Sequence, residues 1–315
     1  MTLIAVFIII IAAGCAKEGP PRSDKELIIF HAGSLSVPFR DISAAFNELR
    51  PDVTIKAEAA GSRACARKIS DLKRQCDVMA SADYKVIANL LMPEYADFNI
   101  QFAANEMAIA YTKKSRFAEQ ITAENWHEIL LKENVAIGRA DPDLDPCGYR
   151  TVMALQLAQK HYNIPGLADK LLNKEWVIRP KETDLLVLLE AGEIDYVFIY
   201  RSVASQHGLE ILFLPDQINL KSSDMKEFYN TAKVEVSGKE PGETIIRTGE
   251  PMIYAVTICK DAPNPKVAAD YVAFLLSPKG QAIIERNGQE FIQPPKAFGY
   301  DYLPEKIKPL CKPVD

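Results

Sequence analysis

Glu-Leu-Ile-Ile-Phe-His-Ala-Gly-Ser, at residues 26–34, is the stretch that decides the fold. Its first six residues form a short, mostly apolar run typical of a buried strand, which Ala32-Gly33-Ser34 then ends. Downstream, apolar side chains recur with helical spacing at 39, 42, 46 and 49, and Pro51 ends the pattern. The stretch therefore predicts a strand, a short connection and a helix.

The same alternation continues along the chain. The expected strands are short apolar runs at 53–57, 77–81, 107–111, 135–137, 176–178, 196–200 and 252–258. The expected helices show apolar residues three or four apart and lie at about 62–74, 85–92, 126–130, 147–160, 183–189 and 266–286. Residues 216–250 are polar and are expected to be irregular. This order predicts an α/β fold, with mostly parallel sheets flanked by helices.

Length and composition narrow the class of protein. The chain has 315 residues, which corresponds to about two domains. Hydrophobic residues make up 48% and charged residues 25%, so disorder, collagen-like repeats and a polytopic membrane protein are excluded. With 37 Lys and Arg against 42 Asp and Glu, the formal net charge is -5. No nucleic-acid partner is expected, because general nucleic-acid binders usually carry a basic excess.

The first residues predict export. Residues 1–14 are uncharged and apolar, are too short to cross about 30 Å of hydrocarbon, and end in Ala-Ala-Gly directly before Cys15. This pattern resembles a bacterial lipobox, although no Lys or Arg precedes the apolar run. Residues 1–14 are therefore expected to be a lipoprotein signal peptide, Cys15 the lipidated residue, and residues 15–23 a linker. The alternative is an ordinary signal peptide in which Cys15 has no role.

Five further cysteines remain, at 65, 76, 147, 259 and 311. Their number is odd, so at least one is expected to be free or to pair with another chain. A Cys65–Cys76 bridge is open in an oxidising compartment only if the chain turns back before Cys76, because eleven residues of straight helix span about 16 Å. No CxxC occurs and the four histidines are scattered, which argues against a zinc site.

Two serines follow neighbouring predicted strands. Ser34 comes after the first strand and Ser62 after the second, and each is preceded by glycine. Ligands of open α/β sheets bind beyond the carboxyl ends of strands, and helix N-termini favour anions. For each serine taken alone an N-cap role is the more common explanation, and both roles can hold at once. Their repetition at consecutive strand ends favours an anion site.

The acidic loop at residues 141–145 has the pattern Asp-x-Asp-x-Asp. A calcium loop of the EF-hand type needs glycine at its sixth position and glutamate at its twelfth, where this chain has Pro146 and Val152. Asp145 instead precedes a predicted helix, so it is a candidate cap. Glu182 stands before another predicted helix and has the same alternative role.

Several stretches together make the chain resemble the periplasmic molybdate/tungstate-binding proteins of ABC importers, and most closely the tungstate-binding branch of archaea and some bacteria. The similarity covers about residues 25–295. The matching stretches are FHAGSLSVPF (30–39), AAGSRACARKISDLKRQCDVMASADY (59–84), ANEMAIAYTK (104–113), DPDLDPCGYR (141–150), RPKETDLLVLLEAGEIDYVFIYRSVA (179–204) and YVAFLLSPKGQAIIERNG (271–288).

The resemblance implies a set of ligand-binding residues. The oxyanion-binding residues of the family fall on Ser34, Ser62, the backbone N–H of Cys147, and Tyr200. Two carboxylates of the tungstate branch, which approach the metal of the bound oxyanion, fall on Asp145 and Glu182. Asp143, two residues away in the same loop, is an alternative to Asp145.

The resemblance also implies a fold and a location. The family fold is the type II periplasmic-binding-protein fold, in which two α/β lobes close on the ligand like a hinge. Lobe 1 is expected to comprise residues 24–104 plus 214–315, and lobe 2 residues 105–213. The protein is expected to be a monomer outside the cytoplasmic membrane, held by its lipid anchor, and to need no cofactor.

Three classes of function are compatible with these observations. The leading one is capture of tungstate or molybdate and delivery to an ABC permease, or capture of another tetrahedral oxyanion such as sulfate or phosphate, with no catalysis. The second is a hydrolase that uses Asp145 and Glu182 as general acid and base. It is disfavoured because neither a GxSxG elbow nor a P-loop pattern occurs. The third is a sensor or adhesion lipoprotein that reuses the fold.

The predicted anchor is testable by replacing one residue. The Cys15→Ser variant should appear as soluble or unprocessed protein, because the serine hydroxyl cannot accept the lipid thioether. Cell fractionation and intact-mass measurement check this outcome. Cleavage elsewhere in the wild type, with an unmodified Cys15, would show that the segment is an ordinary signal peptide.

Overall fold

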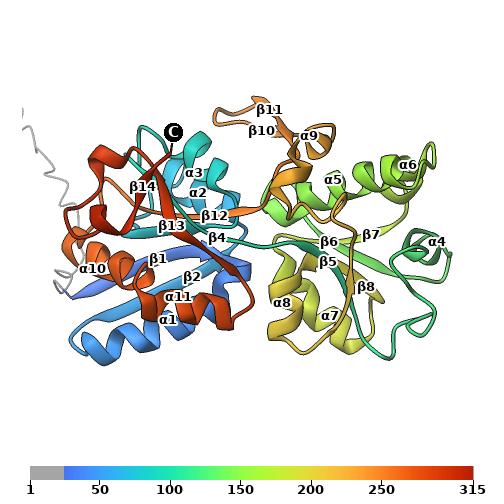
Figure 1. The fold of residues 1–315 in the computed structure, drawn as a ribbon, viewed down its shortest axis with the longest axis horizontal. Helices are drawn as coiled ribbons and strands as arrows, with labels where there is room; N and C mark the ends of the chain where they lie inside the picture. The colour runs from blue at the N-terminus through green and yellow to red at the C-terminus, as the bar shows by residue number, and fades with distance from the viewer. Residues whose placement is uncertain (1–24, 315) are drawn as a thin grey trace, which may run out of the picture.

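The computed structural model describes residues 25–314. The expected signal peptide, the expected lipidation site Cys15 and the expected linker at 15–23 lie outside the described residues. Two α/β lobes stand side by side, joined by crossing segments (Figure 1). The two-lobed α/β architecture expected from the sequence is thereby confirmed.

The large lobe is built on a seven-stranded sheet. Its strands, in spatial order, are β14 (Lys312–Pro313), β13 (Glu290–Phe298), β4 (Asn99–Ala104), β12 (Ile253–Ile258), β3 (Val78–Ser81), β1 (Glu26–Ala32) and β2 (Thr54–Ala60). β1 pairs in parallel with both β2 and β3. β12, which follows the segment at the seam between the lobes, is antiparallel to both β3 and β4.

The small lobe is built on a five-stranded sheet. Its strands, in spatial order, are β7 (Trp176–Arg179), β6 (Ile137–Ala140), β8 (Tyr196–Tyr200), β5 (Met107–Tyr111) and β9 (Glu210–Phe213). β6 is parallel to β7 and β8. β5 is antiparallel to both of its neighbours, because it comes directly from β4 of the large lobe. Each sheet therefore combines parallel and antiparallel pairs; in the large lobe β13 is also antiparallel to β4.

The helices cover the faces of these sheets. Those of the large lobe are α1 (Ser36–Leu49), α2 (Ser62–Ser70), α3 (Tyr84–Leu90), α10 (Pro265–Leu275) and α11 (Pro278–Arg286). Those of the small lobe are α4 (Trp126–Leu130), α5 (Pro146–His161), α6 (Leu167–Leu172), α7 (Leu186–Ala191) and α8 (Arg201–Gln206). Short 3-10 turns at Gly33–Leu35 and Glu182–Leu185 precede α1 and α7.

The segment at 216–250, expected to be irregular, contains regular structure. It holds α9 (Lys226–Tyr229) and a two-stranded antiparallel hairpin, β10 (Lys233–Ser237) and β11 (Thr244–Thr248). The hairpin contacts both lobes: the carbonyl of Lys233 accepts a hydrogen bond from Gln156 of α5 at 2.8 Å, and the carbonyl of Gly238 accepts one from Arg67 of α2 at 2.6 Å. It therefore bridges the seam between the lobes.

Two chain crossings between the lobes lie against each other. The N–H of Met107, at the start of β5, donates to the carbonyl of Asn219 at 2.8 Å. The N–H of Met252, just before β12, donates to the carbonyl of Leu220 at 2.9 Å. These bonds tie the segment that leaves the large lobe to the segment that returns to it.

All five described cysteines are buried and free. The Cys65–Cys76 bridge considered from the sequence is not formed, even though the chain does turn back after α2. The thiol of Cys65 donates to the carbonyl of His31 at 3.4 Å, and that of Cys76 to the carbonyl of Val78 at 3.1 Å. Both sulfurs belong to an apolar cluster beneath α2 and α3, where they act as small hydrophobic side chains.

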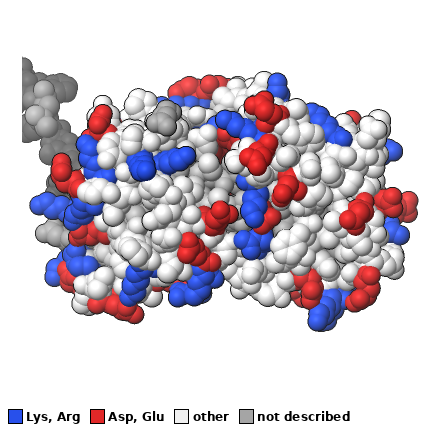
Figure 2. All heavy atoms as spheres, viewed as in Figure 1, with Lys and Arg blue, Asp and Glu red and all other residues white. Residues whose placement is uncertain are grey.

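Acidic and basic side chains are interspersed on the face shown in Figure 2, in keeping with the small net charge. Among residues 25–314 there is no helix with the length and apolar character needed to cross a bilayer.

Candidate functional site

The six residues singled out from the sequence gather at the seam between the lobes. Ser34 lies in the turn after β1 and Ser62 at the start of α2, both in the large lobe. The small lobe contributes the other four from three loops and strand ends: Asp145, Cys147, Glu182 and Tyr200. All six are at most 2% exposed. The lobes are therefore closed over this site.

Three hydroxyl groups of the site share one hydrogen-bonding pattern. The hydroxyl of Ser34 accepts from that of Tyr254 at 3.1 Å, and Ser62 Oγ accepts from the N–H of Ala82 at 3.0 Å. The phenol oxygen of Tyr200 accepts from Arg150 Nη1 at 3.0 Å. Since each oxygen already accepts, each hydroxyl keeps its own proton for donation. The arrangement thus supplies three buried O–H donors from the two lobes.

Asp145 is the cap of helix α5. Its Oδ1 accepts from the N–H of Cys147 at 2.9 Å, and its Oδ2 accepts from the N–H of Glu182 at 3.1 Å. The Cys147 N–H, implied as a ligand donor by the resemblance, is thus engaged by Asp145 in this structure. The capping role considered for Asp145 is confirmed, and the same carboxylate also fixes the loop that carries Glu182.

Unlike the carboxylate of Asp145, the carboxylate of Glu182 does not cap a helix. Neither of its oxygens has a hydrogen-bond partner among the described residues, although the side chain is 1% exposed. Burial and the adjacent carboxylate of Asp145 raise the pKa of Glu182 well above its usual range. A buried carboxylate without donors is costly, so the group is stable here only when protonated or bound to a ligand.

The side chain of Asp143 points elsewhere. Asp143 is exposed, and its Oδ1 accepts from the N–H of Ser237 on the hairpin at 2.7 Å. Of the two aspartates that the sequence left open, only Asp145 therefore lies beside Glu182. Asp143 and Asp145 of the Asp-x-Asp-x-Asp loop therefore lie in different surroundings and do not surround one ion.

Near Ser62 the backbones of the two lobes are joined directly by hydrogen bonds. The carbonyl of Leu144, in the small lobe, accepts from the N–H groups of Arg63 and Ala64 in the first turn of α2, each at 3.1 Å. Two of the free N–H groups of this helix N-terminus, expected to face an anion, are thus used to join the lobes. A Cβ on Gly61 would lie 2.3 Å from the same carbonyl oxygen, so only glycine allows this approach.

The site has little that favours nucleophilic or metal-cofactor chemistry. Burial, followed by the charges of Asp145 and Glu182, raises the pKa of the Cys147 thiol well above its usual range, which disfavours the reactive thiolate. Within residues 25–314 no group of three or more His, Cys, Asp or Glu side chains is arranged to hold a metal ion. The chemistry gathered at the seam is that of three hydroxyl donors and one buried carboxylate without hydrogen-bond partners among the described residues.

Two residues of the site escaped the sequence analysis. Tyr254 lies in a strand whose sequence pattern indicates only a buried strand. Its hydroxyl accepts a hydrogen bond from Asn105 Nδ2 at 3.0 Å and donates one to Ser34. Arg150 is 3% exposed and contacts both lobes. Its position one turn after Cys147, on the same buried helix face, was the available signal.

Comparisons with known proteins agree with one another. The family model for bacterial extracellular solute-binding proteins matches residues 27–290. The chain is 49% identical to an uncharacterized solute-binding protein of Petrotoga mobilis, over 91% of this chain and 90% of that protein. It is 42% identical to the molybdate/tungstate-binding protein WtpA of Pyrococcus abyssi, over 99% of this chain and 97% of that protein. The fold is similar to that of the periplasmic molybdate-binding protein of Azotobacter vinelandii, with a TM-score of 0.63 at 16% identity, over 84% of this chain and 98% of that one.

The close approach at Gly61 generates a prediction about closure. The Gly61→Ala variant should fold but close incompletely, because its methyl group would collide with the carbonyls of Leu144 and Pro180. Small-angle scattering should report a larger radius of gyration than for the wild type. A matched control is Gly208→Ala: Gly208 has φ 63° and open space around it, so this change should cost stability without opening the lobes. Equal radii for Gly61→Ala and the wild type would contradict the prediction.

Proposed function

The chain belongs to the bacterial extracellular solute-binding protein family, and on that premise we propose that it captures tungstate or molybdate between its two lobes. The observation that carries this proposal is the pairing of two features in one closed site. Three hydroxyls have protons free for donation, and one buried carboxylate, that of Glu182, has no donor of its own. The similarity to a molybdate/tungstate-binding protein at 42% identity supports it.

The hydroxyls suit the oxygens of a tetrahedral oxyanion. Hydrogen bonds to a charged acceptor are stronger than neutral ones, and donors from both lobes make closure depend on the anion. Ser34 and Ser62 would donate from the large lobe and Tyr200 from the small lobe. In this proposal the Cys147 N–H contributes after it exchanges its bond to Asp145 for one to the ligand.

The carboxylates favour the heavier oxyanions. A carboxylate near a dianion is repelled, and the repulsion is severe where water is excluded. Molybdenum and tungsten can expand their coordination from four towards six oxygens, so Glu182, and Asp145 beside it, would become ligands of the metal centre. For sulfate or phosphate, only a protonated Glu182 is tolerable, as a hydrogen-bond donor.

The family and the fold support a role in delivering the bound anion to a membrane permease. We propose that the protein works outside the cytoplasmic membrane, tethered by lipid on Cys15, and hands its anion to an ABC permease as a monomer. The bonded crossings at Met107–Asn219 and Leu220–Met252 would serve as the hinge. The bodies that move would then be residues 24–104 with 214–315, and residues 105–213.

Loss of one hydroxyl should weaken binding measurably. The Ser62→Ala variant should bind tungstate about 10- to 100-fold more weakly, because one bond to a charged acceptor contributes about 1.5–3 kcal/mol. Ser43→Ala is the matched control, since Ser43 lies in the same lobe and its hydroxyl bonds that of Tyr271 at 3.1 Å. Calorimetric titration measures both. If the two variants bind alike, Ser62 serves only as part of helix α2.

Glu182→Gln separates the two classes of anion. Glutamine keeps a hydrogen-bond donor at this position but is a poor metal ligand, so affinity for tungstate and molybdate should fall at least tenfold while the weaker sulfate and phosphate binding changes little. Titrations of wild type and variant with all four anions give the comparison. A variant that loses affinity for all four equally would indicate a hydrogen-bonding role for Glu182.

The coordination number of bound tungsten gives a direct test. X-ray absorption of the tungstate complex should contain oxygen neighbours beyond the four of the free anion, and Glu182→Gln should reduce them. A spectrum that remains four-coordinate in the wild type would mean that these carboxylates are not ligands.

A further inference from the structure

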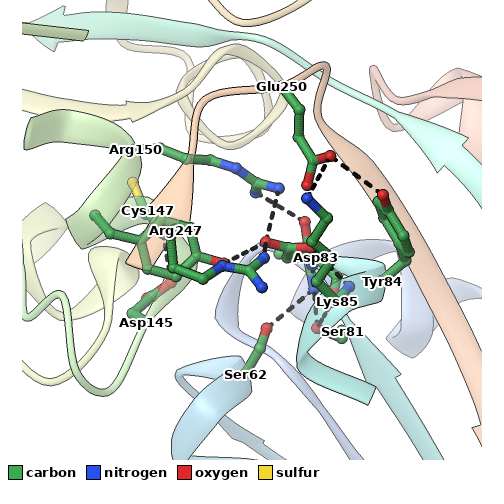
Figure 3. Close-up of polar contacts among 12 residues, drawn as sticks. Ser62, Ser81, Asp83, Tyr84, Lys85, Asp145, Cys147, Arg150, Arg247 and Glu250 are labelled. Carbon is green, nitrogen blue, oxygen red and sulfur yellow. Dashed lines mark hydrogen bonds and ion pairs between the residues drawn. The ribbon is translucent and has the colours of Figure 1, made fainter. Parts of the chain in front are cut away.

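Asp83 is the meeting point of three segments (Figure 3). It caps α3 of the large lobe, with Oδ1 accepting from the N–H of Lys85 at 2.8 Å. Its Oδ2 accepts from Arg247 Nη2 of the bridging hairpin at 2.6 Å and from the hydroxyl of Tyr149 on α5. Arg150 Nη2, also on α5, lies 3.7 Å from the same oxygen. The carboxylate thus joins the large lobe, the small lobe and the hairpin.

The charges in this cluster are withdrawn from water. Asp83, Arg150 and Arg247 are all buried. Burial by itself raises the pKa of Asp83, but the Arg247 and Arg150 charges outweigh it and hold that pKa well below its usual range. The aspartate is therefore ionised and paired with two guanidinium groups. Removal of one partner would leave a buried charge without full compensation, which is strongly unfavourable.

Arg150 extends from this cluster to the proposed anion-binding hydroxyls. Its Nη1 donates to the phenol oxygen of Tyr200 at 3.0 Å and to the carbonyl of Ala82 at 2.8 Å. The N–H of the same Ala82 donates to Ser62 Oγ at 3.0 Å. The guanidinium group of Arg150 is thus bonded directly to Tyr200 of the small lobe. It is linked to Ser62 of the large lobe through one intervening residue, Ala82.

We infer that Arg150, held by Asp83 and Arg247, is a positioning residue that sets the separation of Ser62 and Tyr200 and directs their protons to the anion in the closed protein. The planar, permanently charged fork suits this role, because it donates to several fixed acceptors at once. A hydroxyl that accepts from a cation is also polarised and becomes a better donor. The inference rests on the proposed function and deepens it, by identifying how closure and anion contact are coupled.

The test measures tungstate dissociation by stopped-flow fluorescence in the full-length protein. Arg150→Met should release tungstate at least tenfold faster than the wild type, with a smaller change in association rate, since closure then no longer aligns the donors. Arg150→Lys, which keeps the charge but loses the fork, should fall between the two. Arg247→Met should also accelerate release, and Arg247→Lys should restore most of the wild-type rate.

The matched control is Arg116→Met. Arg116 Nη1 pairs with the buried Asp195 at 2.7 Å, but both residues lie within the small lobe, away from the seam. This variant should lower the melting temperature and leave the dissociation rate unchanged. A merely structural role for Arg150 would make its variant behave like the control.

The outcomes separate the inference from the proposed function. If the wild type binds tungstate and both Arg150→Met and Arg247→Met release it at the wild-type rate, the positioning role is wrong and the proposed function stands. If the wild type binds none of the four oxyanions, the proposed function fails and the inference fails with it. If Arg150→Met does not fold, Arg247→Met and its lysine counterpart decide, because they leave α5 intact.

Discussion

The contact between the Leu144 carbonyl and the first turn of α2 sets the geometry of the whole seam. Two N–H groups of a helix N-terminus in one lobe are satisfied by a single carbonyl of the other, at 3.1 Å each. Such a bond cannot form unless the backbones approach without an intervening side chain, which is why glycine stands at position 61. Once this contact is made, Ser62 and Asp145, each one residue away from it, are held at the same place.

The polar groups at the seam divide into two zones with different charge balance. In one zone the carboxylate of Asp83 is compensated by Arg150 and Arg247, and its hydrogen bonds are complete. In the other zone neither carboxylate oxygen of Glu182 has a hydrogen-bond partner among the described residues, and the nearby carboxylate of Asp145 outweighs the charge of Lys181. Buried networks that are fully satisfied stabilise one conformation, whereas unsatisfied groups need a binding partner. The seam therefore combines a zone whose polar groups are satisfied between the lobes with a zone in which a buried carboxylate has no hydrogen-bond partner among the described residues.

Much of this architecture could be predicted from the sequence, because apolar runs report buried strands directly. The strands at 107–111 and 196–200 were predicted with the bounds that the structure has, and the helix beginning at about 147 starts at Pro146. β4 and β13 were not recognised, and neither was the β10–β11 hairpin in a segment that reads as polar and irregular. That hairpin is stabilised by contacts with residues far away in the sequence, such as Gln156 and Arg67, which no local pattern contains.

The candidate site was predictable in part for the same reason. Loops after strand ends pointed to Ser34 and Ser62, and the resemblance added the carboxylates, but the local pattern could not separate Asp143 from Asp145. The difference is tertiary: one side chain bonds the hairpin and the other caps α5 and holds the loop of Glu182. Arg247 was equally hidden, because its partner Asp83 lies 164 residues earlier in the chain. Sequence reasoning therefore found the groups that are proposed to face the ligand and missed Arg150 and Arg247, whose partners are distant in the sequence.

The unsatisfied carboxylate of Glu182 bears most directly on which anion the site suits. A site that bound a permanently four-coordinate anion would need only donors, and the hydroxyls already provide them. A buried acid with no donor in reach lowers the stability of the closed form by a few kcal/mol, since its desolvation is not compensated. That cost is offset either by protonation of the carboxylate or by a bond that it forms when a ligand arrives. An anion whose central atom accepts further oxygen ligands provides such a bond, so the same residue that destabilises the empty closed form would favour molybdate and tungstate over their lighter analogues.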